Sequence, residues 1–158
     1  MKVIDYVREE VSRQGHDVFA LDGIERVGWM LGAWCTALER AAERSPTLSD
    51  IIELGQKVEV WKNKRGIRII GVRVGLRVCP PAHEVIERLQ ELLRKRKVRE
   101  KSNIEMTPLD FYREFEEIHP FVDGNGRTGK ILLNWLNGTL YDPIFPPNDF
   151  WGEPILNP

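Results

Sequence analysis

The sequence predicts a mainly α-helical fold, and two patterns support this prediction. Between residues 24 and 41, apolar side chains recur every three or four positions, which places them on one face of a long helix. Apolar residues also recur at helical spacing on both sides of a glycine-rich stretch, residues 119–130. We expect helices at about 2–14, 24–44, 48–60, 81–97, 107–118 and 127–140.

The first helices carry the clearest periodicity. Residues 2–14 mix acidic and apolar side chains, which favours a short helix and excludes a signal peptide. The stripe of the long second helix consists of Ile24, Val27, Leu31, Trp34, Leu38 and Ala41. We expect this stripe, and Cys35 beside it, to lie in the hydrophobic core.

The last two helices flank the glycine-rich stretch. The helix before it is marked by Pro108, Leu109, Phe111, Tyr112, Phe115 and Ile118, and the one after it by Ile131, Leu132, Leu133, Trp135 and Leu136. Pro120 disfavours helical geometry at His119, so we expect the first of these helices to stop there. From Tyr141 on, prolines exclude a regular helix, and we expect Phe145, Phe150 and Trp151 to pack this tail onto the body.

Composition is typical of one globular domain in the cytoplasm. The chain has 158 residues, of which 42% are hydrophobic and 30% charged, and its net charge of −1 argues against nucleic-acid binding. The basic run at residues 94–99 lacks interleaved aromatics, so we interpret it as a solvated helix end and loop. Two cysteines, Cys35 and Cys79, fit reduced thiols, and no apolar segment is long enough to span a membrane.

The glycine-rich stretch contains groups that suit phosphate binding. Gly124 and Gly126 let the backbone approach a ligand and turn several N–H groups the same way. The helix that follows begins near Arg127, so its unpaired N–H groups favour an anion. Arg127 and Lys130 share a face of the first turn, where both can meet phosphate oxygens.

Two further residues of the stretch suit catalysis. The carboxylate of Asp123 could hold Mg²⁺ against bound phosphates. His119 has the imidazole that a general base near neutral pH requires. Together with the anion-binding groups, these residues indicate phosphate-ester chemistry.

Two other loop types fit less well. Residues 124–130 match G-x-x-x-x-G-K, but a P-loop then needs Ser or Thr where this chain has Ile131, and it follows a strand rather than a helix such as 111–118. An EF-hand starting at residue 123 would need Gly and Glu where the chain has Thr128 and Asn134.

The stretch from His119 to Lys130 resembles the Fic motif, H-x-F-x-[DE]-G-N-G-R-x-x-R, at every specified position except the last. The resemblance extends over roughly residues 47–151. Thr47–Ile52 is similar to the family's first core helix, Arg65–Gly75 to its hairpin, called the flap, and Cys79–Leu93 to the helix after the flap. The resemblance implies a Fic-type helical bundle with one small β-hairpin. In this arrangement, residues 1–46 form N-terminal helices that pack on a core at 47–151, and residues 152–158 form a tail.

The resemblance implies a protein adenylyltransferase that moves AMP from ATP to a Tyr, Thr or Ser hydroxyl of a target protein and releases pyrophosphate. His119 would deprotonate the hydroxyl, and Asp123 would bind Mg²⁺ between the α- and β-phosphates. The anion hole would consist of Gly124, Asn125 and Gly126. Arg127 would hold the phosphate chain.

Two further roles follow from the same resemblance. Phe121 would anchor the loop by packing. The flap would pair its backbone with the target segment, and the residues expected to dock it are Ile67, Arg68, Ile69 and Ile70.

Lys130 departs from the motif, in which Arg reaches the terminal phosphate. Lysine keeps the charge but loses the planar fork, so we expect ATP to be held less tightly or in another pose. A Fic enzyme that moves another phosphate-containing group is therefore an alternative, as is a solvated Lys130 with no role. A nucleotide-binding pseudoenzyme or interaction module is the other class, although such a binder needs neither His119 nor Asp123.

The family's inhibitory motif, [ST]-x-x-x-E-[GN], has no convincing match. Ser49–Glu53 fits in part, but Leu54 breaks the pattern, and Asp22-Gly23 is a weaker echo. We expect that inhibition is either lacking or supplied by a separate, antitoxin-like partner.

Overall fold

The computed structural model of the chain describes residues 1–101, 106–148 and 150, and the side chains of these residues except 98–101. The α-helices are α1 (Val3–Arg13), α2 (Leu21–Ala41), α3 (Leu48–Val58), α4 (Val85–Lys101), α5 (Pro108–Ile118) and α6 (Asn125–Asn137). Two short strands, β1 (Arg73–Val74) and β2 (Arg77–Val78), form an antiparallel hairpin, and a 3₁₀ turn, η1 (Ala82–Glu84), precedes α4. The mainly helical prediction is confirmed.

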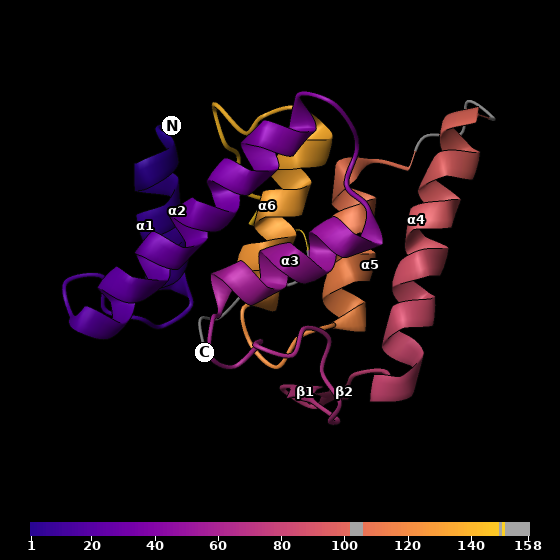
Figure 1. Ribbon diagram of the computed structural model, residues 1–158, viewed down its shortest axis with the longest axis horizontal. Helices are drawn as coiled ribbons and strands as arrows, with labels where there is room; N and C mark the ends of the chain where they lie inside the picture. Colours follow the sequence, from indigo (N-terminus) through magenta and orange to yellow (C-terminus); the bar gives the residue numbers. More distant parts are fainter. Residues whose placement is uncertain (102–105, 149, 151–158) are drawn as a thin grey trace.

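Helix α6 is the centre of the bundle. It contacts α2, α3 and α5, and α4 packs on the far side of α5 (Figure 1). Every residue from Arg127 to Trp135 is buried, because neighbouring helices cover α6 on several sides. The glycine-rich stretch leads directly into this central helix, so the fold holds it firmly.

Local sequence signals fix where several helices begin and end. At the start of α3, Thr47 and Asp50 form a reciprocal capping box, and Thr107 and Asp110 do the same for α5. Gly138 ends α6 in a left-handed conformation (φ 70°), which is why α6 stops before the expected residue 140.

The N-terminal helices share one hydrophobic core with the rest of the chain. Tyr6 of α1 and Trp34 of α2 are fully buried in this core, and the indole of Trp34 donates to the carbonyl of Leu140. In the tail, Phe145 stacks on Tyr6 with ring centres 4.0 Å apart, and Phe150 lies against Tyr112. Trp151 and residues 152–158 lie outside the described residues.

The expected core face of α2 is partly wrong. Ile24 and Cys35 are exposed, whereas Met30, Ala33 and Ala37 are buried. The small alanines allow neighbouring helices to approach closely, so the buried face is centred on them. Of the predicted stripe, Trp34 is fully buried, whereas Val27, Leu31, Leu38 and Ala41 lie at the edge of the core.

Two further segments differ from expectation. The hairpin lies at residues 73–78, later than the expected 65–75, because its turn falls at Gly75 (φ 59°), the position of a two-residue turn that favours glycine. Helix α4 continues to Lys101, so the basic run at 94–99 is helical rather than helix end and loop. None of the described helices has the length and apolar character needed to cross a lipid bilayer.

Candidate active site

His119 lies where α5 ends. It adopts a left-handed conformation (φ 52°, ψ 64°), the sole positive φ at a non-glycine residue in the described chain. The imidazole of residue 119 therefore leaves the helix at a turn that the following Pro120 helps to impose. The backbone carbonyl of His119 accepts a 2.7 Å hydrogen bond from Nε of Arg68, which fixes this turn from outside.

The imidazole of His119 is held in its neutral form. Burial lowers its pKa below the ordinary value, because the imidazolium would lose hydration, and the nearby charges of Arg77 and Arg68 act in the same direction. Its Nδ1 atom is buried and has no hydrogen-bond partner among the described residues. A neutral imidazole at neutral pH can accept a proton, as a general base must.

The loop from His119 to α6 is tied by Phe121 and Asn125. Phe121 is fully buried, as expected of a packing anchor, and its ring lies against Gly55 of α3. The Asn125 amide accepts from the backbone N–H of Phe121 (2.8 Å) and donates to its carbonyl (2.9 Å). The Asn125 side chain therefore shapes the loop through its two bonds to the backbone of Phe121.

Asp123 presents a partly exposed carboxylate on this loop. It accepts hydrogen bonds from the backbone N–H of Gly124 (2.7 Å) and from Nζ of Lys62 (2.8 Å). Burial acts to raise its pKa, but these two donors and the charge of Arg127 outweigh burial, so the pKa of Asp123 is lowered. The Asp123 backbone is held by the buried Asn63, whose amide donates to its carbonyl.

The start of α6 offers free backbone donors. Gly124 caps the helix with a left-handed φ of 74°, and the first intrahelical bond runs from Thr128 to Gly124. Helix geometry leaves the N–H groups of Asn125, Gly126 and Arg127 without an intrahelical acceptor. Such amides and the positive end of a helix dipole favour the binding of an anion.

Arg127 points into the protein rather than outward. Its guanidinium is buried and donates to a carboxylate oxygen of Glu59 (2.9 Å) and to the carbonyl of Val58 (3.2 Å). Arg26 of α2 binds the same Glu59 through two hydrogen bonds. This buried Arg26–Glu59–Arg127 group joins α2, the end of α3 and α6.

Lys130 is also buried and paired, so its interpretation as a solvated side chain was wrong. Its Nζ lies 2.8 Å from Oε1 of Glu10 and 3.3 Å from the hydroxyl of Tyr112. Burial opposes its charge, but the attraction of Glu10, Tyr112 and Glu116 outweighs it and raises the pKa of Lys130. The carboxylate of Glu10, from α1, thus favours the charged form of Lys130 and pairs with it.

Sequence reasoning missed the residues that surround Lys130. Glu10 belongs to α1, Gln14 directly follows that helix and Glu116 belongs to α5, and no local pattern distinguishes them from solvated polar side chains. The Gln14 amide donates to Glu10 and lies so close to Gly126 that a methyl group there would come within 2.9 Å of it. Burial raises the pKa of Glu116 to about 7.

The residues expected to dock a target lie beside the catalytic loop. Ile69 and Ile70 are exposed, Ile67 is half-buried and Arg68 is buried. The Arg68 guanidinium donates to four backbone carbonyls, those of Ile70, Pro80, Ile118 and His119. Arg68 therefore fastens this segment to the end of α5.

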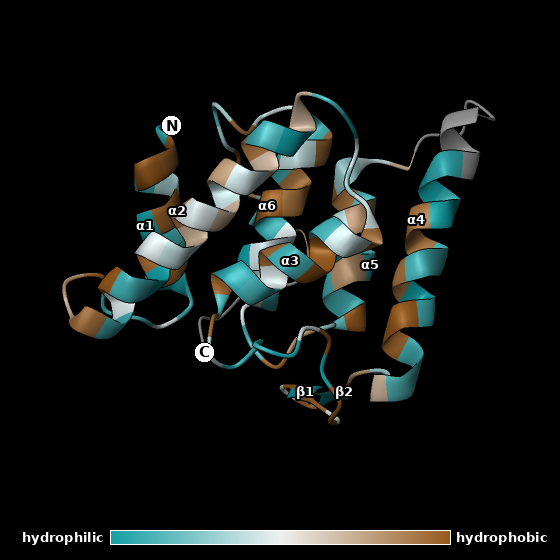
Figure 2. Ribbon diagram, viewed as in Figure 1, coloured by the Kyte–Doolittle hydropathy of each residue, from teal (hydrophilic) through white to brown (hydrophobic). Residues whose placement is uncertain are grey.

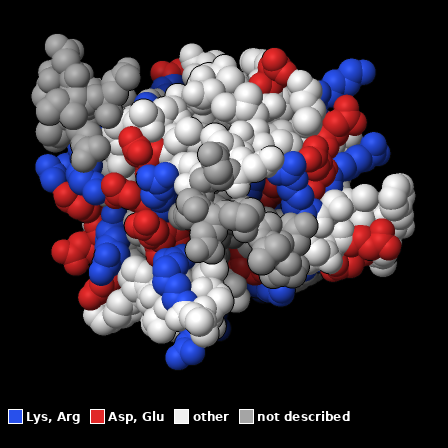
Figure 3. Space-filling model, turned by 180° about the vertical axis from the view of Figure 1, so that it is seen from behind, with Lys and Arg blue, Asp and Glu red and all other residues white. Residues whose placement is uncertain are grey.

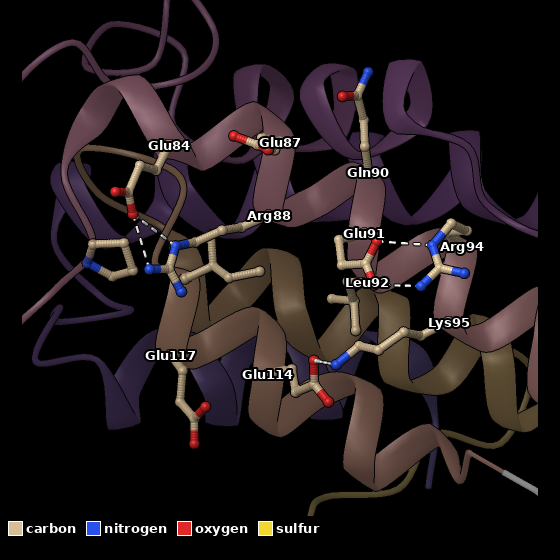
Figure 4. Close-up of a pocket in the computed structure, with 12 residues that line it drawn as sticks. Glu84, Glu87, Arg88, Gln90, Glu91, Leu92, Arg94, Lys95, Glu114 and Glu117 are labelled. Atoms are coloured by element: carbon tan, nitrogen blue, oxygen red, sulfur yellow. Dashed lines mark hydrogen bonds and ion pairs between the residues drawn. The ribbon is translucent and has the colours of Figure 1, made fainter.

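A hollow lies between α4 and α5, and its lining includes Pro80 and Ile118, whose carbonyls accept hydrogen bonds from Arg68. It has a volume of about 910 Å³ and is lined by paired charges such as Arg88 with Glu84 and Lys95 with Glu114 (Figure 4). Among the described residues, no three His, Cys, Asp or Glu side chains gather as a metal site. A single carboxylate such as Asp123 suits Mg²⁺ that is carried mainly by substrate phosphates.

The sequence model of the Fic/DOC family matches residues 45–137, so the chain belongs to this family. The match runs from α3 to the end of α6 and includes the whole stretch from His119 to Lys130.

One relative has a named activity. The chain is 39% identical over 140 residues to a protein of Aquifex aeolicus (strain VF5) named "Probable protein adenylyltransferase aq_aa38". This alignment covers 84% of the chain but 44% of the relative, so the chain spans less than half the length of that protein.

Proposed function

We propose that the protein transfers AMP from ATP to a Tyr, Thr or Ser hydroxyl of a target protein, with release of pyrophosphate. The observation that carries the proposal is the position of His119, an imidazole with a lowered pKa, at one end of the loop whose other end begins α6, where three backbone N–H groups have no intrahelical acceptor. A base and a helix N-terminus that favours an anion, joined by one short loop, suit attack on a phosphate ester.

The proposed reaction starts with proton transfer. His119 accepts the proton of the target hydroxyl as its oxygen attacks the α-phosphorus of ATP. The bond between this phosphorus and the oxygen bridging to the β-phosphate breaks, and pyrophosphate leaves. The backbone N–H groups of Asn125 and Gly126 stabilise the negative charge on the phosphates, and most of the rate gain comes from positioning.

Asp123 is the residue that would hold Mg²⁺ in this site. When bound, the ion would neutralise the leaving pyrophosphate. The lowered pKa of Asp123 keeps its carboxylate ionised, and the N–H of Gly124 orients one of its oxygens. Lys62 occupies the other oxygen and would have to yield to the metal.

A second candidate is transfer of another phosphate-containing group. The observation that favours it is the pairing of both cations of the motif: Arg127 binds Glu59 and Lys130 binds Glu10. Neither cation is presented to a γ-phosphate in this arrangement. A donor nucleotide without a γ-phosphate would not need Arg127 or Lys130 for this contact.

Labelled nucleotide tests the proposed function. The protein is incubated with a bacterial lysate, Mg²⁺ and ATP labelled at the α-phosphate, and labelled proteins are separated on a gel. We expect label on discrete proteins, and none with His119→Ala. The matched control is His83→Ala, since His83 is an exposed histidine of η1 outside the site. Equal labelling by the parent and His119→Ala would refute the assigned base.

A further inference from the structure

The hairpin and the chain on either side of it are unusually basic. Residues 60–83 contain six Lys or Arg side chains and no Asp or Glu. The rest of the chain carries 17 basic and 24 acidic residues, so positive charge is concentrated next to the catalytic loop. Figure 3 shows white and blue surface at the lower end of the molecule, where Figure 1 places the hairpin.

Three of these six cations have structural roles. Lys62 pairs with Asp123, and Arg68 fastens the segment beside His119. Arg77 donates to the carbonyls of Glu117 (2.9 Å) and Glu116 (3.2 Å) at the end of α5. These contacts hold the segment in place and leave its other charges for a partner.

The other three cations are Lys64, Arg65 and Arg73. All three are exposed, and no hydrogen bond or ion pair within the described chain engages their side chains. Of the six cations, Lys62 alone is paired with a carboxylate among the described residues, so the other positive charges repel one another and an acidic partner would relieve this repulsion.

Exposed aliphatic side chains lie between the cations. Leu76 at the hairpin tip is 99% exposed, Ile69 is 73% exposed and Val78 is 66% exposed. Figure 2 shows hydrophobic residues in this hairpin, outside the core. In the antiparallel register, Arg73 is opposite Val78, so a cation and an apolar side chain share one face of the hairpin.

We propose that residues 60–83 bind an extended, acidic segment of the target protein, in which Asp or Glu residues alternate with apolar ones near the modified hydroxyl. This inference rests on the proposed function, because the bound segment is taken to belong to the protein that receives AMP. Arg65 and Arg73 meet the acidic side chains, and Ile69, Leu76 and Val78 cover the apolar ones. The bond from Arg68 to the His119 carbonyl keeps this surface next to the base.

Aliphatic side chains and a free strand edge suit a polypeptide better than a nucleic acid. Single-stranded nucleic acids are held by aromatic rings that stack on bases, and Trp61 is the one aromatic residue of the segment. Extended peptides instead add to a strand edge and place alternate side chains against the neighbouring surface.

Binding of peptides without a hydroxyl acceptor tests the proposal independently of catalysis. The probe is a fluorescein-labelled peptide of alternating Glu and Val with a central Phe, compared with the same peptide carrying Lys in place of Glu. Fluorescence anisotropy at low salt should show about tenfold or greater preference for the acidic peptide, and the preference should shrink as salt rises.

Charge reversal identifies the residues responsible for the preference for the acidic peptide. Arg65→Glu/Arg73→Glu should abolish or invert the preference, while the matched double variant Arg8→Glu/Lys97→Glu, at two exposed cations outside the segment, should keep it. Circular dichroism checks that both variants remain folded. No preference in the parent, or a preference that survives the first reversal, would overturn the proposal.

Two other outcomes are distinguishable. If a labelled single-stranded oligonucleotide binds more tightly than the acidic peptide and depends on the same two arginines, the surface is a nucleic-acid site and the proposal is overturned. If the acidic peptide binds as expected but no AMP reaches any lysate protein, residues 60–83 are a peptide-binding surface and the proposed function is wrong.

Discussion

The ammonium group of Lys130 lies 2.8 Å from a carboxylate oxygen of Glu10, and both side chains are buried where α1 meets α6. The second oxygen of Glu10 is buried without a hydrogen-bond partner among the described residues. Lys130 therefore depends on an N-terminal helix that lies outside the part of the chain matched by the family, residues 45–137.

Removing this carboxylate should destabilise the protein. Glu10→Gln leaves a buried ammonium group without its counter-charge, and the loss of one partner of a buried pair costs about 3–5 kcal/mol of unfolding free energy. Urea denaturation measures the loss. The control is Glu9→Gln, because the adjacent Glu9 makes only a surface pair with Arg13 and should cost about 1 kcal/mol or less. Equal losses from both variants would mean that Lys130 finds another partner.

Glu116 should make stability depend on pH. Its pKa rises from the ordinary 4.5 in the unfolded chain to about 7 in the folded protein, chiefly through burial. Between these values the unfolded chain releases the proton that the folded protein still holds, so the contribution of Glu116 to stability falls as pH rises. Above pH 7 the folded protein holds Glu116 as a buried, ionised carboxylate, which lowers its stability by about 3 kcal/mol.

Replacing Glu116 should therefore remove this slope. Glu116→Gln should gain stability relative to the parent as pH rises from about 4.5 to about 7, and the difference should level off above that range. Thermal or urea unfolding at several pH values measures it, with the exposed neighbour Glu117→Gln as control. Parallel pH profiles for the parent and Glu116→Gln would contradict a raised pKa.

Replacement of Gly55 should destabilise the protein, because the ring of Phe121 packs directly against it. A methyl group on Gly55 would lie 2.1 Å from the Phe121 ring, which anchors the catalytic loop. Gly55→Ala should cost on the order of 2 kcal/mol of unfolding free energy and lower activity, as overpacking does. Gly28 of α2 is the matched control, since nothing lies within 4 Å of the added methyl and alanine favours a helix by about 1 kcal/mol. If Gly55→Ala were as stable as Gly28→Ala, the loop would not depend on this contact.

Asp123 should carry the magnesium dependence of nucleotide binding. Asp123→Asn keeps the size of the side chain and removes its charge, so Mg²⁺ should no longer tighten ATP binding. Calorimetric titration of ATP with and without Mg²⁺ measures this effect. The exposed Asp142→Asn provides the control. A magnesium effect of parental size in Asp123→Asn would assign the metal to other residues.

Much of the fold could be predicted because its signals are local. Thr107, Pro108 and Asp110 form a readable helix start, and Gly138 a readable helix end. The apolar residues from Ile131 to Leu136 indicated a helix, and the glycine-rich loop before it indicated the candidate site. The hairpin was misplaced because its turn falls at Gly75 and residues 67–70 are held instead by Arg68, through contacts with distant carbonyls that no local pattern encodes.

The electrostatics of the site could not be predicted for the same reason. Lys130 meets Glu10 across 120 positions of sequence, and Arg127 meets Glu59 across 68. From the sequence alone, both cations belong to an exposed first turn of a helix. Only tertiary packing shows that this turn is buried and that carboxylates reach it.

The position of the transferred label tests the central claim most directly. Parent protein, Mg²⁺ and lysate are incubated in parallel with ATP labelled at the α-phosphate and with ATP labelled at the γ-phosphate. Transfer of AMP predicts protein-bound label from the α-labelled nucleotide alone, lost with His119→Ala. Label from the γ-labelled nucleotide that depends on His119 would contradict adenylyl transfer, and no label from either would indicate a nucleotide-binding protein without turnover.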